Sequence, residues 1–140
     1  MLKLERLLVV EDDPTDMREA AETARGLGIG VIEGMSSSEL ALIRLDRGLR
    51  GELSLPDAVV VDLDLGVESG YELLRFWHAN RRVSAIPLVV WSRLGENHKA
   101  VCEAFKITGF VSKHEGPAAL REALEALGST RVSTPKPNLT

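Results

Sequence analysis

The sequence has almost no cysteine, no excess of basic charge and no long apolar run, and each absence excludes a class of protein. Cys102 is the single cysteine, so no intrachain disulfide can form, and a reducing cytoplasm is the expected location. The net charge of −4 argues against a general nucleic-acid binder, because phosphate backbones reward clustered Lys and Arg. No stretch approaches the roughly 18 apolar residues of a membrane span, and the N-terminus lacks the apolar core of a signal peptide. We therefore expect no direct contact with nucleic acid or membrane.

What the chain does contain is a series of short apolar runs that alternate with longer amphipathic stretches. Its 140 residues amount to about one domain. Uninterrupted apolar runs are typical of strands buried on both faces of a parallel sheet, and we expect strands at 7–10, 30–32, 58–61, 88–91 and 109–112. Helix-start signals predict five helices, which open at Asp13-Pro14, Ser36, Ser69 or Gly70, Gly95 and Gly116-Pro117.

These five β-α units predict an α/β fold with a doubly wound five-stranded parallel sheet and helices on both faces. We expect the domain to occupy residues 1–128. Residues 129–140 are polar and contain two prolines, so we expect a flexible tail.

Acidic and other polar residues come directly after four of the five expected strands. They are Glu11, Asp12 and Asp13 after the first strand, Asp62 and Asp64 after the third, Ser92 after the fourth and Lys113 after the fifth. In an open α/β sheet these carboxyl ends share one edge, and ligands bind there beside the point where strand order reverses. Each residue alone has an ordinary structural explanation, and we expect Asp13 to be only a helix cap. The inference rests on their joint occurrence.

Carboxylates gathered at one edge repel one another and need a compensating cation. Mg²⁺ suits them, because it prefers oxygen ligands and commonly joins carboxylates to a phosphate. A metal there would neutralise the charge of a phosphoryl group during its transfer to Asp62. Ser92 would then hydrogen-bond a phosphoryl oxygen, and Lys113 would pair with it as a charge.

The motifs resemble those of the receiver domains of two-component response regulators, over about residues 5–127. The matching segments are Leu8–Pro14 (LVVEDDP), Val59–Leu65 (VVVDLDL) with Gly70, Pro87–Ser92 (PLVVWS) and Gly109–Lys113 (GFVSK). The resemblance implies the flavodoxin-like strand order 2-1-3-4-5. It also implies a metal site formed by Glu11, Asp12, Asp62 and the backbone carbonyl of Asp64, with Asp62 as phosphoacceptor and with Ser92 and Phe110 as switch residues.

The resemblance further implies a single-domain response regulator rather than a turnover enzyme. Its phosphodonor would be a sensor histidine kinase or a histidine phosphotransfer protein, and a downstream protein target would read the surface around the fourth and fifth helices. Self-dephosphorylation is expected, and a homodimer remains open. The spacing of the motifs also resembles stand-alone receivers that partner bacterial phytochromes.

Four positions depart from the family pattern. His114 follows Lys113 where the family usually has a proline in a cis bond, and Gly66 also stands in place of a proline. Arg93 replaces a small residue after Ser92, so it either narrows access to Asp62 or adds a contact to the phosphoryl group. Phe110 lacks the hydroxyl of the aromatic switch residue.

Two other functions remain open. Asp62-Leu63-Asp64 resembles the nucleophile motif of haloacid-dehalogenase-type phosphatases, in which a second Asp acts as acid and base, although no second acidic pair follows Ser92. A receiver-like interaction module that signals without phosphorylation is the other alternative, supported by Arg93 and by the missing proline after Lys113.

Overall fold

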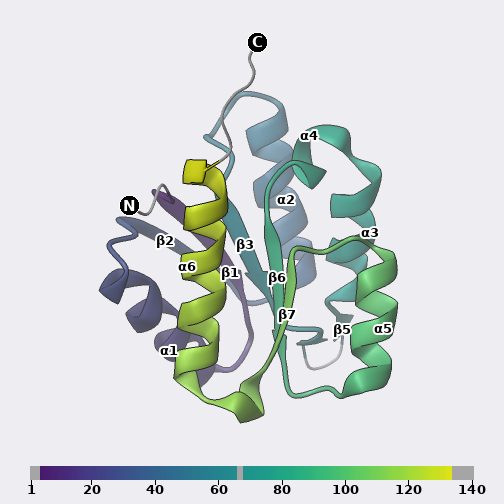
Figure 1. The fold of residues 1–140 in the computed structure, drawn as a ribbon. Helices are drawn as coiled ribbons and strands as arrows, with labels where there is room; N and C mark the ends of the chain where they lie inside the picture. The colour runs from purple at the N-terminus through teal and green to yellow at the C-terminus, as the bar shows by residue number, and fades with distance from the viewer. Residues whose placement is uncertain (1–3, 66–67, 134–140) are drawn as a thin grey trace.

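A parallel sheet of five strands forms the centre of the molecule (Figure 1). The computed structural model describes residues 4–65 and 68–133. The strands of this sheet are β1 (Arg6–Val10), β2 (Val31–Met35), β3 (Ala58–Val61), β6 (Leu88–Ser92) and β7 (Gly109–Ser112). They lie in the order β2-β1-β3-β6-β7, and every neighbouring pair is parallel. Counted along the chain this is the order 2-1-3-4-5, so the predicted fold class is confirmed.

Helices cover both faces of the sheet. They are α1 (Pro14–Gly26), α2 (Ser38–Leu49), α3 (Tyr71–Ala79), α4 (Arg81–Ser84), α5 (Glu96–Ala104), the 3₁₀ turn η1 (Lys113–Glu115) and α6 (Pro117–Ser133). Figure 1 shows α1 and α6 together on one side of the sheet and α2, α3 and α5 on the other. A two-stranded antiparallel ribbon, β4 (Asp64–Leu65) with β5 (Glu68–Ser69), lies outside the main sheet.

The central strands are buried because alternate side chains serve two separate hydrophobic clusters. Val59 and Val61 of β3 belong to the cluster beneath α2 and α3, whereas Ala58 and Val60 belong to the cluster beneath α1 and α6. All four residues are at most 1% exposed. Side chains alternate between the two faces of a strand, so a run without a polar residue requires cover on both faces. This explains why apolar runs were sufficient to predict the central strands.

Local signals placed most helix starts correctly and one wrongly. The side chain of Asp13 accepts a hydrogen bond from the backbone N–H of Thr15, which confirms it as the N-cap of α1. For α2 the prediction of Ser36 was wrong, since the Oγ of Ser37 accepts from Leu40 N at 3.1 Å. The strand before it, β2, runs to Met35 rather than ending at residue 32. Three consecutive serines offer the same cap chemistry, so the sequence did not distinguish them.

Two regions named in the sequence predictions lie wholly or partly outside the described residues. Gly66 is one of them, and residues 134–140 of the expected tail are the other. Within the described part α6 continues to Ser133, past the expected domain boundary at residue 128, and that boundary stays a prediction. None of the described helices is long and apolar enough to cross a membrane.

Candidate phosphoacceptor and metal site

The register of the sheet brings the acidic strand ends together. Val10 of β1 pairs with Val61 of β3, so Glu11 and Asp62 leave the sheet side by side. The backbone N–H of Asp62 donates to the carbonyl of Val10 at 3.0 Å. The order of the strands reverses beside β1: β2 lies on one side of β1, and the next strand in sequence, β3, lies on the other. Glu11 and Asp62 therefore meet at the reversal point, where open α/β sheets bind ligands.

The ammonium of Lys113 lies at the centre of this site and donates three hydrogen bonds. The acceptors are Glu11 Oε1 at 2.7 Å, Asp16 Oδ2 at 2.8 Å and Asp62 Oδ2 at 2.9 Å. The side chain of Lys113 is 3% exposed, and none of the three carboxylates exceeds 6%. An ammonium has three N–H bonds, and here all of them are used. The structure thus places Lys113 in a buried ion cluster with three carboxylates, while its predicted pairing with a phosphoryl oxygen stays a prediction.

The sequence predictions did not include Asp16 in the cluster, and they did not include its contact with Arg93. Arg93 donates to Asp16 through two nitrogens, at 2.9 Å to Oδ2 and 3.3 Å to Oδ1. The guanidinium of Arg93 therefore pairs with Asp16, a contact that neither predicted role for Arg93 included. Asp16 stands in the first turn of α1, not directly after a strand, so its position in the sequence does not mark it as part of this edge.

Burial and charge act in opposite directions on the ionisation of these groups. Burial, helped by the charge of Asp62, outweighs the opposing effect of Lys113 and raises the pKa of Glu11 to about 7. For Asp16 burial also acts upward, but hydrogen bonds from Arg93 and Lys113 outweigh it and lower its pKa to about 2. Burial alone would lower the pKa of Lys113, yet its three carboxylate partners raise it. The ammonium is thus firmly charged, and the cluster is built around it.

Carboxylates of the same cluster could also hold a metal ion. One oxygen each of Glu11, Asp12 and Asp62 lie within 4.8 Å of one another, and Asp12 is exposed to solvent while the other two are buried. When Glu11 is ionised, these three residues and Asp16 bring four negative charges, whereas Lys113 and Arg93 bring two positive ones. The remaining imbalance equals the charge of one divalent cation. Oxygen donors and this charge fit a hard divalent metal.

The loop after Asp62 is held by backbone contacts. The N–H of Asp64 donates to Asp62 Oδ1 at 3.0 Å, and the N–H of Gly70 donates to the carbonyl of Leu63 at 2.9 Å. A Cβ at Gly70 would collide with the backbone carbonyl of Asp62. Gly70 is therefore required for the close approach of α3 to this loop. The side chain of Asp64 is exposed, and the predicted role of its carbonyl toward a metal stays a prediction.

The end of β6 contributes Ser92 and, beneath Lys113, Trp91. Ser92 is fully buried, and its Oγ accepts from the N–H of Leu94 at 3.2 Å. The ammonium of Lys113 lies 4.8 Å from the ring centroid of Trp91, a cation–π contact. The indole nitrogen of Trp91 is buried and has no hydrogen-bond partner among the described residues. Trp91 is thus a buried ring of the cluster beneath α1 and α6, with the ammonium of Lys113 over its face.

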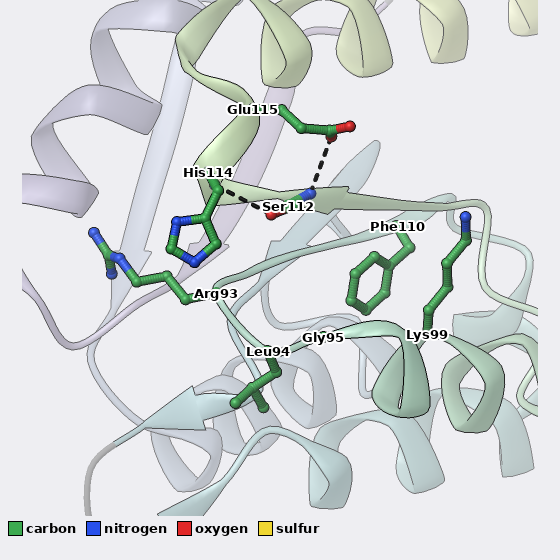
Figure 2. A pocket seen from close by; sticks show the side chains of 8 residues that line it. All are labelled: Arg93, Leu94, Gly95, Lys99, Phe110, Ser112, His114 and Glu115. Atoms are coloured by element: carbon green, nitrogen blue, oxygen red, sulfur yellow. Dashed lines mark hydrogen bonds between the residues drawn. The ribbon is translucent and has the colours of Figure 1, made fainter.

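The turn that carries Lys113 is shaped without a proline. The described residues contain no cis peptide bond, so the bond between Lys113 and His114 is trans. Ser112 Oγ accepts from His114 N at 3.1 Å, and Glu115 Oε1 accepts from Ser112 N at 3.3 Å (Figure 2). This reciprocal pair is a capping box. It fixes the turn η1 where the related pattern relies on proline.

Phe110 borders a pocket of about 160 Å³ next to this turn. Figure 2 shows Arg93 and His114 on one side of the pocket and Phe110 with Lys99 on the other. Phe110 is partly buried and packs against the cluster beneath α2 and α3. Phe110 therefore lies beside Arg93 and Leu94, which follow β6, and its role as a switch residue stays a prediction.

Solved structures with this architecture are numerous. The phosphorylated cyanobacterial phytochrome response regulator RcpA superposes with a TM-score of 0.76 at 21% identity, over 96% of this chain and 99% of that one. The signal receiver domain of a histidine kinase from Syntrophus aciditrophicus gives 0.77 at 21% identity, over 97% and 98%. The chain has the receiver-domain fold.

The same fold is found in the Mn²⁺-bound form of the response regulator Rcp1, with a TM-score of 0.72 at 19% identity over 96% of this chain and 99% of that chain. No protein-family model and no curated protein sequence matches the chain. The resemblance seen in the motifs is therefore confirmed at the level of the receiver fold, which spans nearly the whole chain.

Proposed function

We propose that this receiver fold works as a single-domain response regulator that accepts a phosphoryl group on Asp62. The observation that carries the proposal is the buried Lys113 ammonium, 2.9 Å from Asp62 Oδ2 at the reversal point of the sheet. A lysine in this place is a ready partner for an oxygen of a phosphoryl group carried by Asp62. Its 2.7 Å bond to Glu11 joins the phosphoacceptor to the candidate metal ligands.

In the proposed reaction a carboxylate oxygen of Asp62 attacks the phosphorus of a phosphohistidine. The donor belongs to a sensor histidine kinase or a histidine phosphotransfer protein. A P–O bond forms while the P–N bond breaks, and the imidazole nitrogen leaves with the electron pair. Lys113 pairs with one phosphoryl oxygen, and the hydroxyl of Ser92 donates to another. Glu11, Asp12, Asp62 and the carbonyl of Asp64 would hold Mg²⁺, which when bound would neutralise the charge of the transferring group.

Later attack of water on phosphorus breaks the bond to Asp62, restores its carboxylate and releases phosphate. This hydrolysis resets the phosphorylated state, so the protein acts as a switch and not as a turnover enzyme. Ser92 and Phe110 pass the change to the surface beside α5 and β7, where a downstream protein target reads it. The supporting geometry is the pocket in which Phe110, Arg93 and Leu94 meet. A cytoplasmic location follows from this role, and self-association through the same surface remains open.

The test is incubation with Mg²⁺ and acetyl phosphate, followed by intact-mass spectrometry. We expect the wild-type chain to gain the mass of one phosphoryl group, and the gain to be absent in Asp62→Asn and with EDTA. A gain that persists in Asp62→Asn would place the chemistry elsewhere. No gain in the wild type would favour an interaction module that signals without phosphate. Steady release of phosphate from a small ester, abolished by Asp62→Asn, would instead favour a haloacid-dehalogenase-type phosphatase.

A further inference from the structure

Asp16 is the one carboxylate bound to Lys113 that has no other proposed role. Glu11 and Asp62 belong to the candidate metal cluster, and Asp62 is also the phosphoacceptor. Asp16 lies outside that cluster, although its Oδ2 is 2.8 Å from the same ammonium. Because the Asp16 carboxylate binds Lys113 and is not a candidate metal ligand, it is suited to keep the ammonium in place.

The surroundings of Asp16 fix its carboxylate tightly. The residue is 4% exposed and stands in the first turn of α1. Its Oδ2 accepts from both Lys113 and Arg93, and its Oδ1 accepts a second bond from Arg93. A guanidinium that contacts both oxygens prevents rotation of the carboxylate, because its donors form a planar fork. Arg93 thereby braces Asp16 from the loop after β6, while Asp16 holds Lys113 at the end of β7.

Lys113 needs such support because its side chain is long and flexible. Four rotatable bonds separate its backbone from its ammonium, and a lysine offers a point charge without a fixed geometry. The rest of its contacts are to Glu11, Asp62 and the face of Trp91. Two of those three contacts involve oxygens that the proposed reaction uses for other purposes. Asp16 is the contact that has no such competing use.

We propose that Asp16, braced by Arg93, is a positioning residue that holds the ammonium of Lys113 beside Asp62 for phosphoryl transfer. The inference rests on the proposed phosphorylation of Asp62. The inference predicts the direction in which Asp16 changes the rate of phosphoryl transfer, since a positioning carboxylate speeds the transfer. A carboxylate that merely competed with the phosphoryl group for Lys113 would slow it.

The first experiment compares wild type, Asp16→Asn and Glu22→Gln with acetyl phosphate at saturating Mg²⁺. Glu22→Gln removes the same charge from an exposed position on α1, so it is the matched control. We expect the maximal phosphorylation rate of Asp16→Asn to fall about ten-fold or more, because small misplacement of a catalytic group is costly. The Mg²⁺ concentration for half-maximal rate should change far less than in Asp12→Asn, because Asp16 is outside the metal cluster.

The second experiment changes Arg93, whose side chain is 55% exposed and whose replacement leaves the core intact. Arg93→Ala should lower the maximal rate to a value between those of wild type and Asp16→Asn. Arg93→Lys restores the charge without the fork, so it should recover little of the rate. Full recovery in Arg93→Lys would show that charge alone matters and would overturn the bracing role.

A third measurement reads the position of Lys113 without any phosphodonor or Mg²⁺. Because the ammonium lies 4.8 Å from the Trp91 ring, its displacement should alter the fluorescence of that buried indole. Trp77 belongs to the other hydrophobic cluster and serves as a constant background. We expect a changed emission spectrum for Asp16→Asn and an unchanged one for Glu22→Gln.

The outcomes separate this inference from the proposed function. A wild type that takes up no phosphoryl group would overturn both. A reactive wild type together with an Asp16→Asn variant that reacts as fast or faster would overturn the positioning role alone. An Asp16→Asn variant that is slow but has the Trp91 emission of the wild type would also contradict it, since Lys113 would not have moved.

Discussion

Replacement of Lys113 by methionine tests whether the buried ammonium holds the acidic cluster together. The change keeps the length of the side chain and removes the only cation that contacts Glu11 and Asp62 among the described residues. Breaking a buried ion pair by removing one partner costs about 3–5 kcal/mol, and here three carboxylates that are at most 6% exposed lose the same partner. For a chain of this size the unfolding midpoint should fall by about 10–15 °C.

The pH dependence of this loss has a definite sign. The pKa of Glu11 is raised to about 7 in the folded wild type, against an ordinary value of 4.5, and Lys113 acts to lower it. Without Lys113 the pKa of Glu11 in the folded state should rise further, so between pH 8 and pH 6 the folded variant binds more protons than the folded wild type. Lys113→Met should therefore regain stability as pH falls from 8 to 6. Mg²⁺ should raise its unfolding midpoint more than that of the wild type, because the cation replaces part of the missing charge.

The assay is thermal unfolding followed by circular dichroism, at pH 8 and pH 6, in EDTA and in Mg²⁺, with Lys99→Met as the control. Lys99 is a half-buried lysine of α5, so this variant removes the same charge away from the acidic cluster. Equal stability of Lys113→Met and wild type in EDTA at pH 8 would refute the reasoning. So would an equal loss in Lys99→Met, or a larger loss at pH 6 than at pH 8.

Further predictions concern the loop, the metal and the thiol. Gly70→Ala should lower the free energy of unfolding by about 1–3 kcal/mol in urea titrations, because its Cβ would collide with the carbonyl of Asp62. Mg²⁺ affinity measured by calorimetry should weaken as pH falls from 8 to 6, because Glu11, with a pKa of about 7, must lose its proton to bind the ion. Cys102 is fully buried and burial raises its pKa, so thiol reagents should label it far more slowly in the native protein than in urea.

Each of these three predictions would be contradicted by a specific outcome. A Gly70→Ala variant as stable as wild type would mean that α3 can retreat from the Asp62 loop at no cost. Mg²⁺ affinity that stays constant between pH 8 and pH 6 would mean that Glu11 is already ionised at the lower value. Equal labelling rates of Cys102 in buffer and in urea would show that α5 opens readily.

The sheet and its acidic edge were predictable because they follow from simple local patterns. The run Val59-Val60-Val61 has no polar residue, and only a strand covered on both faces buries all of it. Parallel strands end at one edge, so Glu11 and Asp62 had to approach each other once the order was fixed. No distance information was needed for that step.

Asp16 and Arg93 escaped prediction for a geometric reason. Residues directly after strands can be recognised by position, but Asp16 lies inside the first turn of α1, where an acidic residue is ordinary. Its approach to Lys113 spans 97 positions of sequence, and no local pattern reports it. A signal did exist, since Asp13 caps the helix, and the first turn of a helix that starts at a strand end lies over that edge.

At the turn that carries Lys113 the sequence departs from the family pattern, because no proline follows the lysine. In the structure a capping box fixes this turn instead. The absence of proline after Lys113 raised the question of where its ammonium would lie. Ser112 and Glu115, three residues apart, carry the capping-box spacing that answers it. That spacing is visible in the sequence, and it predicts a capped turn that needs no proline. The short ribbon β4–β5 was also missed, since two-residue strands carry no periodic signal.

The three bonds of Lys113 also have a consequence for the order in which the protein assembles. They join residues 102, 97 and 51 positions apart, and they form only when β7, an edge strand, docks against β6. A partly folded chain without β7 would hold Glu11, Asp16 and Asp62 close together with no lysine between them. Their mutual repulsion disfavours such an intermediate at neutral pH, and acid or a divalent cation should make it more populated. During synthesis the three carboxylates therefore gain their lysine partner only after β7 has been made and has completed the sheet.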